Sequence, residues 1–316
     1  MGVEFKLTDR ELPVSPVFVS FLEQALAQRP HAREIWPDQR SEDLSRVDSA
    51  AHERATAAAA ALMSHRSGRE HLARAYGLLV ALLAGEPAPL EALQARFHFI
   101  CVTGIARTGG SYLTAEIYRS IGIEPERVPP ALAHDGFPEA GPFRLQDGIN
   151  SWVVTLKTTA EYLTMVEVFF AGRAPHEGRV VVPKKLTNFV HAGAFFRRVL
   201  GESMEQVLTL RHPVAACVST YEKSGGLPAD GRFTVRSNIE EWCRRDLEDT
   251  GCRAGRLAEM DYFEAYLRYW EQYHLALAMA GPAAAARLRM AAYGRDTLRA
   301  LAREYHVRYG SGLEPR

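Results

Sequence analysis

Residues 97–112 read FHFICVTGIARTGGSY, and this stretch decides the fold. Its first seven residues are mostly apolar, β-branched or aromatic, which is typical of a buried strand. The apolar residues Leu113, Ile117 and Ile121 then recur at helical spacing, and Gly122 fits a helix stop. A glycine-rich loop at such a junction directs backbone amides and the positive end of the helix dipole at one place above the sheet. The stretch therefore predicts an anion site.

The loop nearly fits the phosphate-binding motif GxxxxGK[ST] of nucleoside triphosphatases over residues 104–111. Gly110 stands where that motif has lysine, and the nearest cation is Arg107 inside the loop. Those enzymes also need a strand that ends in aspartate to hold magnesium. Here the predicted strand 206–210 is followed by Arg211, which repels a metal ion and attracts a phosphate. The sequence therefore predicts phosphate binding with no metal and without γ-phosphoryl transfer.

Two segments resemble those of sulfotransferases that use 3′-phosphoadenosine 5′-phosphosulfate (PAPS). Residues 107–112 resemble the 5′-phosphosulfate loop of that family, written as Lys or Arg followed by Ser-Gly-Thr-Thr. Arg211 and Ser219 lie at the spacing of the family's 3′-phosphate segment. The resemblance covers about residues 97–306. Within the family, the chain is similar to bacterial and assembly-line sulfotransferases. It implies a P-loop-like α/β fold and PAPS as the cofactor.

The resemblance also implies the residues of the site. Cofactor contacts are expected from Arg107, Thr108, Gly109, Gly110, Ser111, Tyr112, Arg211, Ser219 and Tyr293. Arg107 and either Lys184 or Lys185, which follow the apolar strand 180–183, are expected to stabilise charge on the oxygen that bridges sulfur to the leaving phosphate. The chain departs from the family pattern at Gly110 and Ser111, which leave one hydroxyl fewer in the loop.

The general base that must take the acceptor's proton is the least defined group. His134 is the first candidate, because an unperturbed histidine titrates near neutral pH and His134 lies in a proline-rich insertion. Other candidates in that insertion are Glu124, Glu126 and Asp135, and His191 is the next histidine.

Composition narrows the classes of function. The chain has 316 residues, 47% of them hydrophobic, and carries 38 Lys and Arg against 38 Asp and Glu, so no net field favours nucleic acid. The charged N-terminus predicts no signal peptide, and the longest apolar run is far short of the ~20 residues of a membrane span. The four cysteines show no CxxC pair, and Cys101 and Cys217 lie in apolar segments, so a cytoplasmic protein is expected.

Strand and helix patterns alternate along most of the chain. We expect strands at 97–103, 180–183, 206–210 and 287–292, followed by helices at 111–121, 188–200, 214–223 and 295–305. Such alternation predicts a parallel sheet flanked by helices. Residues 1–95 are expected to form a helical N-terminal extension and residues 96–316 the α/β core, with lid insertions near 123–150 and 225–255.

The expected reaction is transfer of the sulfuryl group of PAPS to a hydroxyl, with adenosine 3′,5′-bisphosphate as the product. The acceptor is either a free small molecule or a β-hydroxyacyl chain on an acyl carrier protein, as in polyketide biosynthesis. Two alternatives remain open. One is a P-loop kinase or nucleotide-binding protein, and the other is a non-catalytic module that binds adenosine 3′,5′-bisphosphate.

Overall fold

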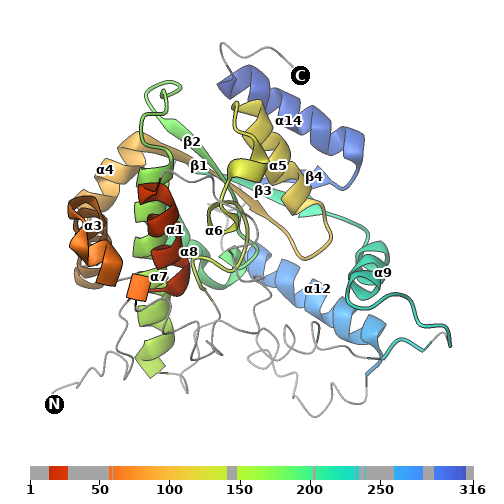
Figure 1. Ribbon diagram of the computed structural model, residues 1–316. Helices are drawn as coiled ribbons and strands as arrows, with labels where there is room; N and C mark the ends of the chain where they lie inside the picture. The colour runs from red at the N-terminus through yellow and green to blue at the C-terminus, as the bar shows by residue number, and fades with distance from the viewer. Residues whose placement is uncertain are drawn as a thin grey trace. The chain divides into compact units, whose positions relative to one another are not determined.

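Four parallel strands form a sheet in the computed structural model of this protein (Figure 1). They are β1 (Phe97–Thr103), β2 (Val180–Lys185), β3 (Glu205–Leu210) and β4 (Leu288–Ala292), in the spatial order β2-β1-β3-β4. Val102 of β1 lies opposite Val207 of β3, and Leu208 of β3 lies opposite Met290 of β4. The predicted α/β class with a parallel sheet flanked by helices is therefore confirmed.

The structure describes residues 14–27, 57–58, 60–140, 148–201, 204–230, 232–234, 239, 260–279 and 288–310. Several predicted features lie outside these residues, namely positions 141–147 of the first lid insertion, most of the second, Cys243 and Cys252. Cys101 and Cys217 are buried and unpaired, as expected of small core residues.

The strand bounds follow the sequence patterns closely. β1 begins and ends where predicted, and of its seven residues all but His98 are buried. β2 continues two residues beyond the predicted strand 180–183, through Pro183 to Lys185. Proline lacks the N–H that a central strand needs, but β2 lies at the edge of the sheet, where one side of the strand has no neighbour to bond. The longer strand brings Lys185 to the carboxyl end of the sheet.

Helices cover both faces of this sheet. α5 (Gly110–Ser120) packs with α14 (Arg295–Tyr309) on one face, where Ser120 Oγ donates a hydrogen bond to the Ala302 carbonyl. On the other face α12 (Tyr262–Met279) packs against α8 (Phe189–Leu200) and α9 (Pro213–Lys223) (Figure 1). α9 starts with Pro213, whose missing N–H and fixed φ suit the first turn of a helix.

The chain divides into two compact units. One comprises residues 1–97 and 123–182, and the other comprises residues 98–122 and 183–316. The grouping joins the helices before the sheet to the segment after α5, whereas the predicted boundary at residue 95 assigned that segment to the core. The β1–α5 loop, the carboxyl ends of β1, β2 and β3, and β4 all belong to the second unit.

The first unit is helical over most of its described length. Its helices are α1 (Pro16–Leu26), α3 (Arg66–Ala84), α4 (Ala88–Arg96), η1 (Pro125–Arg127), α6 (Pro130–Ala133) and α7 (Gly148–Phe169). α7 packs against both α1 and α3, and Arg74 pairs with Glu167 through two hydrogen bonds of 2.8 and 3.0 Å. Phe18, Phe21 and Tyr162 are among its buried side chains. Residues 123–140 belong to the first predicted lid insertion. Two short helices form there, and Leu132 and Phe137 are buried.

No single described helix is long and apolar enough to cross a membrane. α3 and α4 reach the required length and composition only when they are taken together, and the chain bends by 119° between them.

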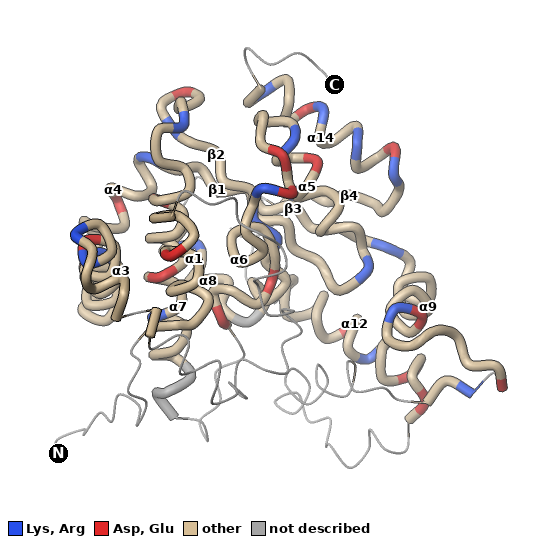
Figure 2. Tube along the Cα trace, viewed as in Figure 1, with Lys and Arg blue, Asp and Glu red and all other residues tan. Residues whose placement is uncertain are grey.

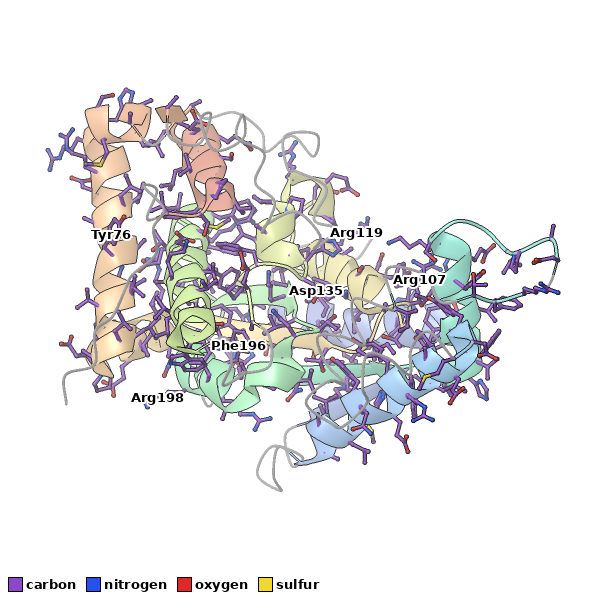
Figure 3. The ribbon with its side chains drawn as sticks, turned by 90° about the horizontal axis from the view of Figure 1, so that it is seen from below. Tyr76, Arg107, Arg119, Asp135, Phe196 and Arg198 are labelled. Atoms are coloured by element: carbon purple, nitrogen blue, oxygen red, sulfur yellow. The ribbon has the colours of Figure 1, made fainter. Side chains whose placement is uncertain are left out.

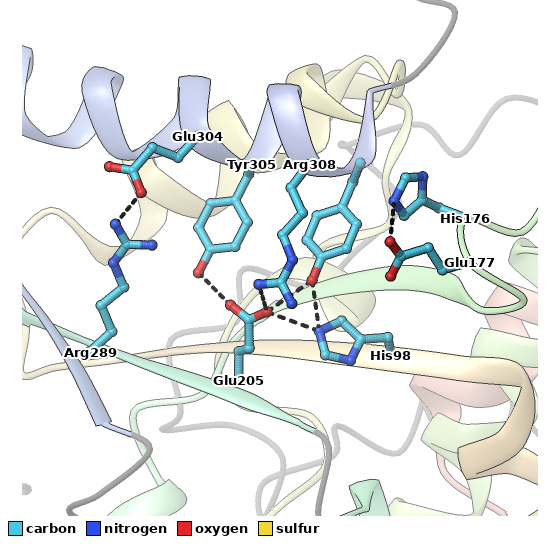
Figure 4. A network of polar contacts seen from close by, with 9 residues as sticks. His98, His176, Glu177, Glu205, Arg289, Glu304, Tyr305 and Arg308 are labelled. Carbon is cyan, nitrogen blue, oxygen red and sulfur yellow. Dashed lines mark hydrogen bonds and ion pairs between the residues drawn. The ribbon is translucent and has the colours of Figure 1, made fainter.

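A polar cluster ties the amino ends of β1 and β3 to α14 (Figure 4). Glu205 of β3 accepts hydrogen bonds from Tyr309 Oη at 2.8 Å and Tyr305 Oη at 3.1 Å, and it also contacts Arg308 and His98. Burial alone would raise the pKa of Glu205, but hydrogen bonds from His98 and Tyr309 and the charge of Arg308 bring it down to about 2. Basic and acidic residues are spread along α14 (Figure 2), and the cluster attaches this charged helix to the sheet.

Candidate functional site

The β1–α5 loop (residues 104–109) leaves the carboxyl end of β1 and leads into the first turn of α5. Gly104, at its start, has φ +138°, and a Cβ there would lie 2.4 Å from Thr209 Oγ1. Gly109, at its end, caps α5 in a left-handed conformation with φ 95°. The glycines in the motif are therefore needed for conformation at both ends of the loop.

Arg107 also has a positive φ, 68°, which is uncommon for a residue with a Cβ and costs about 1 kcal/mol. Left-handed residues placed among right-handed ones turn successive backbone N–H groups toward one concave point, a nest that binds anions. The amides of the first turn of α5 have no acceptors within the helix and add their dipole. The backbone of this loop is thus suited to a phosphate or sulfate group.

The Thr108 side chain holds the loop through hydrogen bonds. It is buried, and its hydroxyl donates a hydrogen bond to the Ile105 carbonyl at 2.7 Å and lies 2.8 Å from the Thr209 hydroxyl of β3. The Thr209 hydroxyl in turn donates to the Thr103 carbonyl. The Thr108 hydroxyl is therefore bonded within the loop and to β3, and a cofactor contact of Thr108 stays a prediction. Ser111, in contrast, is exposed.

Lys185 is the lysine that lies beside the loop. A Cβ added to Gly110 would lie 3.2 Å from Lys185 Cε. The aliphatic part of the Lys185 side chain therefore passes close to the position that holds lysine in the motif GxxxxGK[ST]. Lys184 points to the opposite face of β2 and is 1% exposed. It lies near Cys101, where burial raises the thiol pKa to about 12 and the charge of Lys184 acts against that rise. β2, which lies beside β1 in the sheet, thus supplies a lysine where the loop itself has Gly110.

The second predicted segment meets the first. Arg107 Nε donates a hydrogen bond to Ser219 Oγ of α9 at 3.0 Å, and Arg211 donates to the Arg107 carbonyl at 3.1 Å. Figure 3 shows Arg107 between the start of α5 and α9. Arg211 follows β3 directly, and it lies near the loop because the carboxyl ends of parallel strands share one edge of the sheet.

Tyr293, which directly follows β4, contacts both Arg211 and the loop. The Arg211 guanidinium lies 4.3 Å from the centre of the Tyr293 ring, a cation–π distance. A Cβ on Gly109 would lie 3.0 Å from Tyr293 Cδ2, so the ring also packs on the loop. Tyr293 remains 49% exposed. Tyr112 is placed differently, since its hydroxyl accepts a hydrogen bond from Arg299 of α14.

His134 belongs to the first unit. It follows α6, it is partly buried, and its backbone amide donates to the Pro130 carbonyl at 2.7 Å. Its role as the general base stays a prediction.

α12 carries a histidine that was not among the predicted site residues. His274 Nδ1 lies 2.6 Å from the Trp270 carbonyl, so Nδ1 carries the proton and Nε2 is left as an acceptor. Nε2 is buried and has no partner among the described residues. Burial lowers the pKa of His274, which keeps the ring neutral. The spacing of four from Trp270 was the only signal in the sequence, and it does not distinguish this residue from a packing histidine.

The described residues include no group of three or more His, Cys, Asp or Glu side chains that could hold a metal ion. Among the described residues, the cations Arg107, Lys185 and Arg211 lie together at the loop. In comparisons with known proteins, no family model matches this chain, and no curated protein matches it significantly.

Proposed function

We propose that the protein is a sulfotransferase that moves the sulfuryl group of PAPS to a hydroxyl. The observation that carries the proposal is the hydrogen-bonded chain of Ser219, Arg107 and Arg211 at a nest-forming loop, with Lys185 beside it. These residues come from the ends of three parallel strands and from α9. Two anionic groups on one ligand need such a pair of neighbouring cationic subsites.

In this proposal the loop amides, Arg107 and Lys185 hold the 5′-phosphosulfate, while Arg211 and Ser219 hold the 3′-phosphate. Tyr293 offers an exposed ring for the adenine. PAPS supplies an activated sulfuryl group. The sulfur–oxygen bond to its phosphate breaks as a bond to the acceptor oxygen forms. Fixed cations near the bridging oxygen stabilise the negative charge that develops there.

The acceptor hydroxyl gives up its proton during the transfer, and two histidines are candidates to receive it. His134 is the candidate from the sequence. His274 is a second candidate, because its ring is neutral and its Nε2 has no hydrogen-bond partner among the described residues. The acceptor is a free hydroxyl compound or a carrier-bound β-hydroxyacyl chain.

Lys185 beside Gly110 also supports a second candidate, a nucleotide-dependent phosphotransferase, because it restores a lysine to the phosphate loop. Arg211 at the strand end opposes this candidate, since that position holds the magnesium-binding aspartate in such enzymes. The non-catalytic module that binds adenosine 3′,5′-bisphosphate remains a third.

Calorimetric titration separates the candidates. Binding of adenosine 3′,5′-bisphosphate with little or no binding of ATP and magnesium supports the sulfotransferase or the module, and the reverse preference supports the phosphotransferase. Incubation with PAPS and a panel of alcohols and β-hydroxyacyl carrier proteins then decides between the sulfotransferase and the non-catalytic module. A sulfated product identifies the enzyme.

A further inference from the structure

Two tyrosines of α12, Tyr266 and Tyr273, contact the backbone of the β1–α5 loop. Tyr266 Oη donates a hydrogen bond to the Ala106 carbonyl at 3.3 Å, and the Gly104 amide donates to Tyr273 Oη at 3.2 Å. Residues seven positions apart lie on the same face of a helix, two turns from each other. Both side chains are buried, at 0% and 4% exposed. One helix face therefore touches the loop at two of its first three residues.

Tyr273 also joins the ends of two strands. Its hydroxyl donates to the Thr187 carbonyl at 2.9 Å, and the Thr187 hydroxyl donates back to the Gly104 carbonyl at 3.1 Å. Thr187 lies two residues after Lys185, and Gly104 lies three residues before Arg107. The closed set of bonds between Gly104, Tyr273 and Thr187 thus sets the spacing between the two strand ends that carry these cations.

Tyr266 acts on the conformation of Arg107. The peptide before Arg107 is held by Tyr266 at the Ala106 carbonyl, and the peptide after it is held by Arg211 at the Arg107 carbonyl. A left-handed residue with a Cβ persists where its surroundings hold it. Burial raises the pKa of Tyr266 well above its ordinary value, so its hydroxyl stays protonated and remains a donor.

We propose that Tyr266 and Tyr273 are positioning residues of the anion site, which fix the nest and the spacing of Arg107 and Lys185 through the loop backbone. The choice of nucleotide as a probe rests on the proposed function, whereas the mechanical role of the two phenols does not. Nothing in their sequence positions marks them, since tyrosines at helical spacing are common in cores.

The test uses the full chain with Tyr266→Phe, Tyr273→Phe and the matched control Tyr305→Phe. Each variant keeps its ring and loses one buried hydroxyl, and Tyr305 lies at the other end of the strands, where it donates to Glu205. The measurements are calorimetric affinity for adenosine 3′,5′-bisphosphate and for inorganic pyrophosphate, amide hydrogen exchange over residues 104–112, and the melting temperature. The two test variants should bind about 5- to 10-fold more weakly, the scale of one buried hydrogen bond, and exchange faster in the loop.

Tyr305→Phe should lower the melting temperature with affinity and loop exchange unchanged. Wild-type affinity and wild-type exchange in both test variants would overturn the inference. If the wild-type protein binds no bisphosphate, the proposed function fails, and pyrophosphate affinity together with loop exchange then decides the role of the phenols. Equal losses in all three variants would show a general effect on stability and would also overturn it.

Discussion

Arg107 and Ser219, which lie 112 residues apart in the chain, are joined by a hydrogen bond of 3.0 Å from Nε to Oγ. The bond brings the loop after β1 against the helix after β3, and Arg211 reinforces it at the Arg107 carbonyl. Much of the geometry that an anionic ligand needs is therefore built into the protein, which reduces the ordering cost of binding.

Arg211→Ala tests the assignment of the 3′-phosphate. Loss of a charged hydrogen-bonding partner should weaken adenosine 3′,5′-bisphosphate by about 10- to 100-fold. Because Arg211 also supports the Arg107 carbonyl, adenosine 5′-phosphosulfate should weaken slightly as well. Calorimetry with both ligands measures the difference, and Arg299→Ala, which removes the hydrogen bond to the Tyr112 hydroxyl, is the control. Equal losses for the two ligands would contradict the assignment.

Replacement of Arg107 separates its charge from its backbone conformation. Alanine at φ 68° keeps the strain of a Cβ, whereas glycine relieves it, so Arg107→Ala and Arg107→Gly should differ in stability but not in charge. In the proposed reaction both variants should lose about 10²-fold in kcat, the scale of one missing transition-state donor. Affinity for the bisphosphate should fall much less. Steady-state kinetics with PAPS checks this, and an unchanged kcat would place the catalytic cation elsewhere.

Lys185→Met should change ligand affinity, whereas Lys184→Met should change the melting temperature. Lys185 lies beside Gly110 in the loop, so its loss should reduce pyrophosphate affinity about tenfold with little change in melting temperature. Lys184 is 1% exposed, so its replacement should shift the melting temperature and leave affinity nearly unchanged. Calorimetry and thermal unfolding on the same preparations measure both quantities. A loss of affinity confined to Lys184→Met would reverse the assignment of the two lysines.

Glu161 of α7 should make the stability of the protein depend on pH. Burial raises its pKa to about 7 against the charge of Lys157 and the hydrogen bond from the Ser15 amide, and one carboxyl oxygen has no partner among the described residues. The folded state therefore holds this proton more tightly than the unfolded state. Its contribution to stability is fully present below pH ~4.5 and is lost as the pH rises to about 7.

The matched variant is Glu161→Gln, which keeps the shape of the side chain and cannot ionise. Relative to this variant, the wild type should lose about 3 kcal/mol of unfolding free energy between pH 4.5 and 8, since each pKa unit corresponds to ~1.4 kcal/mol. Denaturant unfolding at several pH values measures the difference. Parallel curves for the wild type and Glu161→Gln would contradict the prediction.

Local patterns in the sequence were enough for the class of fold and for the glycine loop at the carboxyl end of β1. The apolar run at 97–103 and the glycines that follow it predict a strand, a loop and a helix, because strand and helix periods depend on neighbouring residues. Because the carboxyl ends of parallel strands share one edge of the sheet, Arg211 and Arg107 are expected at the same edge, and Arg211 contacts the Arg107 carbonyl. The helical bounds of α5, α8 and α9 differ from the predicted ones by one residue at most at each end.

Tertiary packing decided what local patterns cannot carry. Lys184 and Lys185 are adjacent in sequence, and only the neighbours of each face of β2 determine which of them reaches the loop. The roles of Tyr266 and Tyr273 arise from hydrogen bonds to residues 160 and 169 positions away. The sequence by itself determined the sheet, its helices and the glycine loop, because these follow from short-range periodicity and backbone freedom. The tertiary structure alone decided which side chains converge on the loop, because such contacts depend on the packing of segments far apart in the chain.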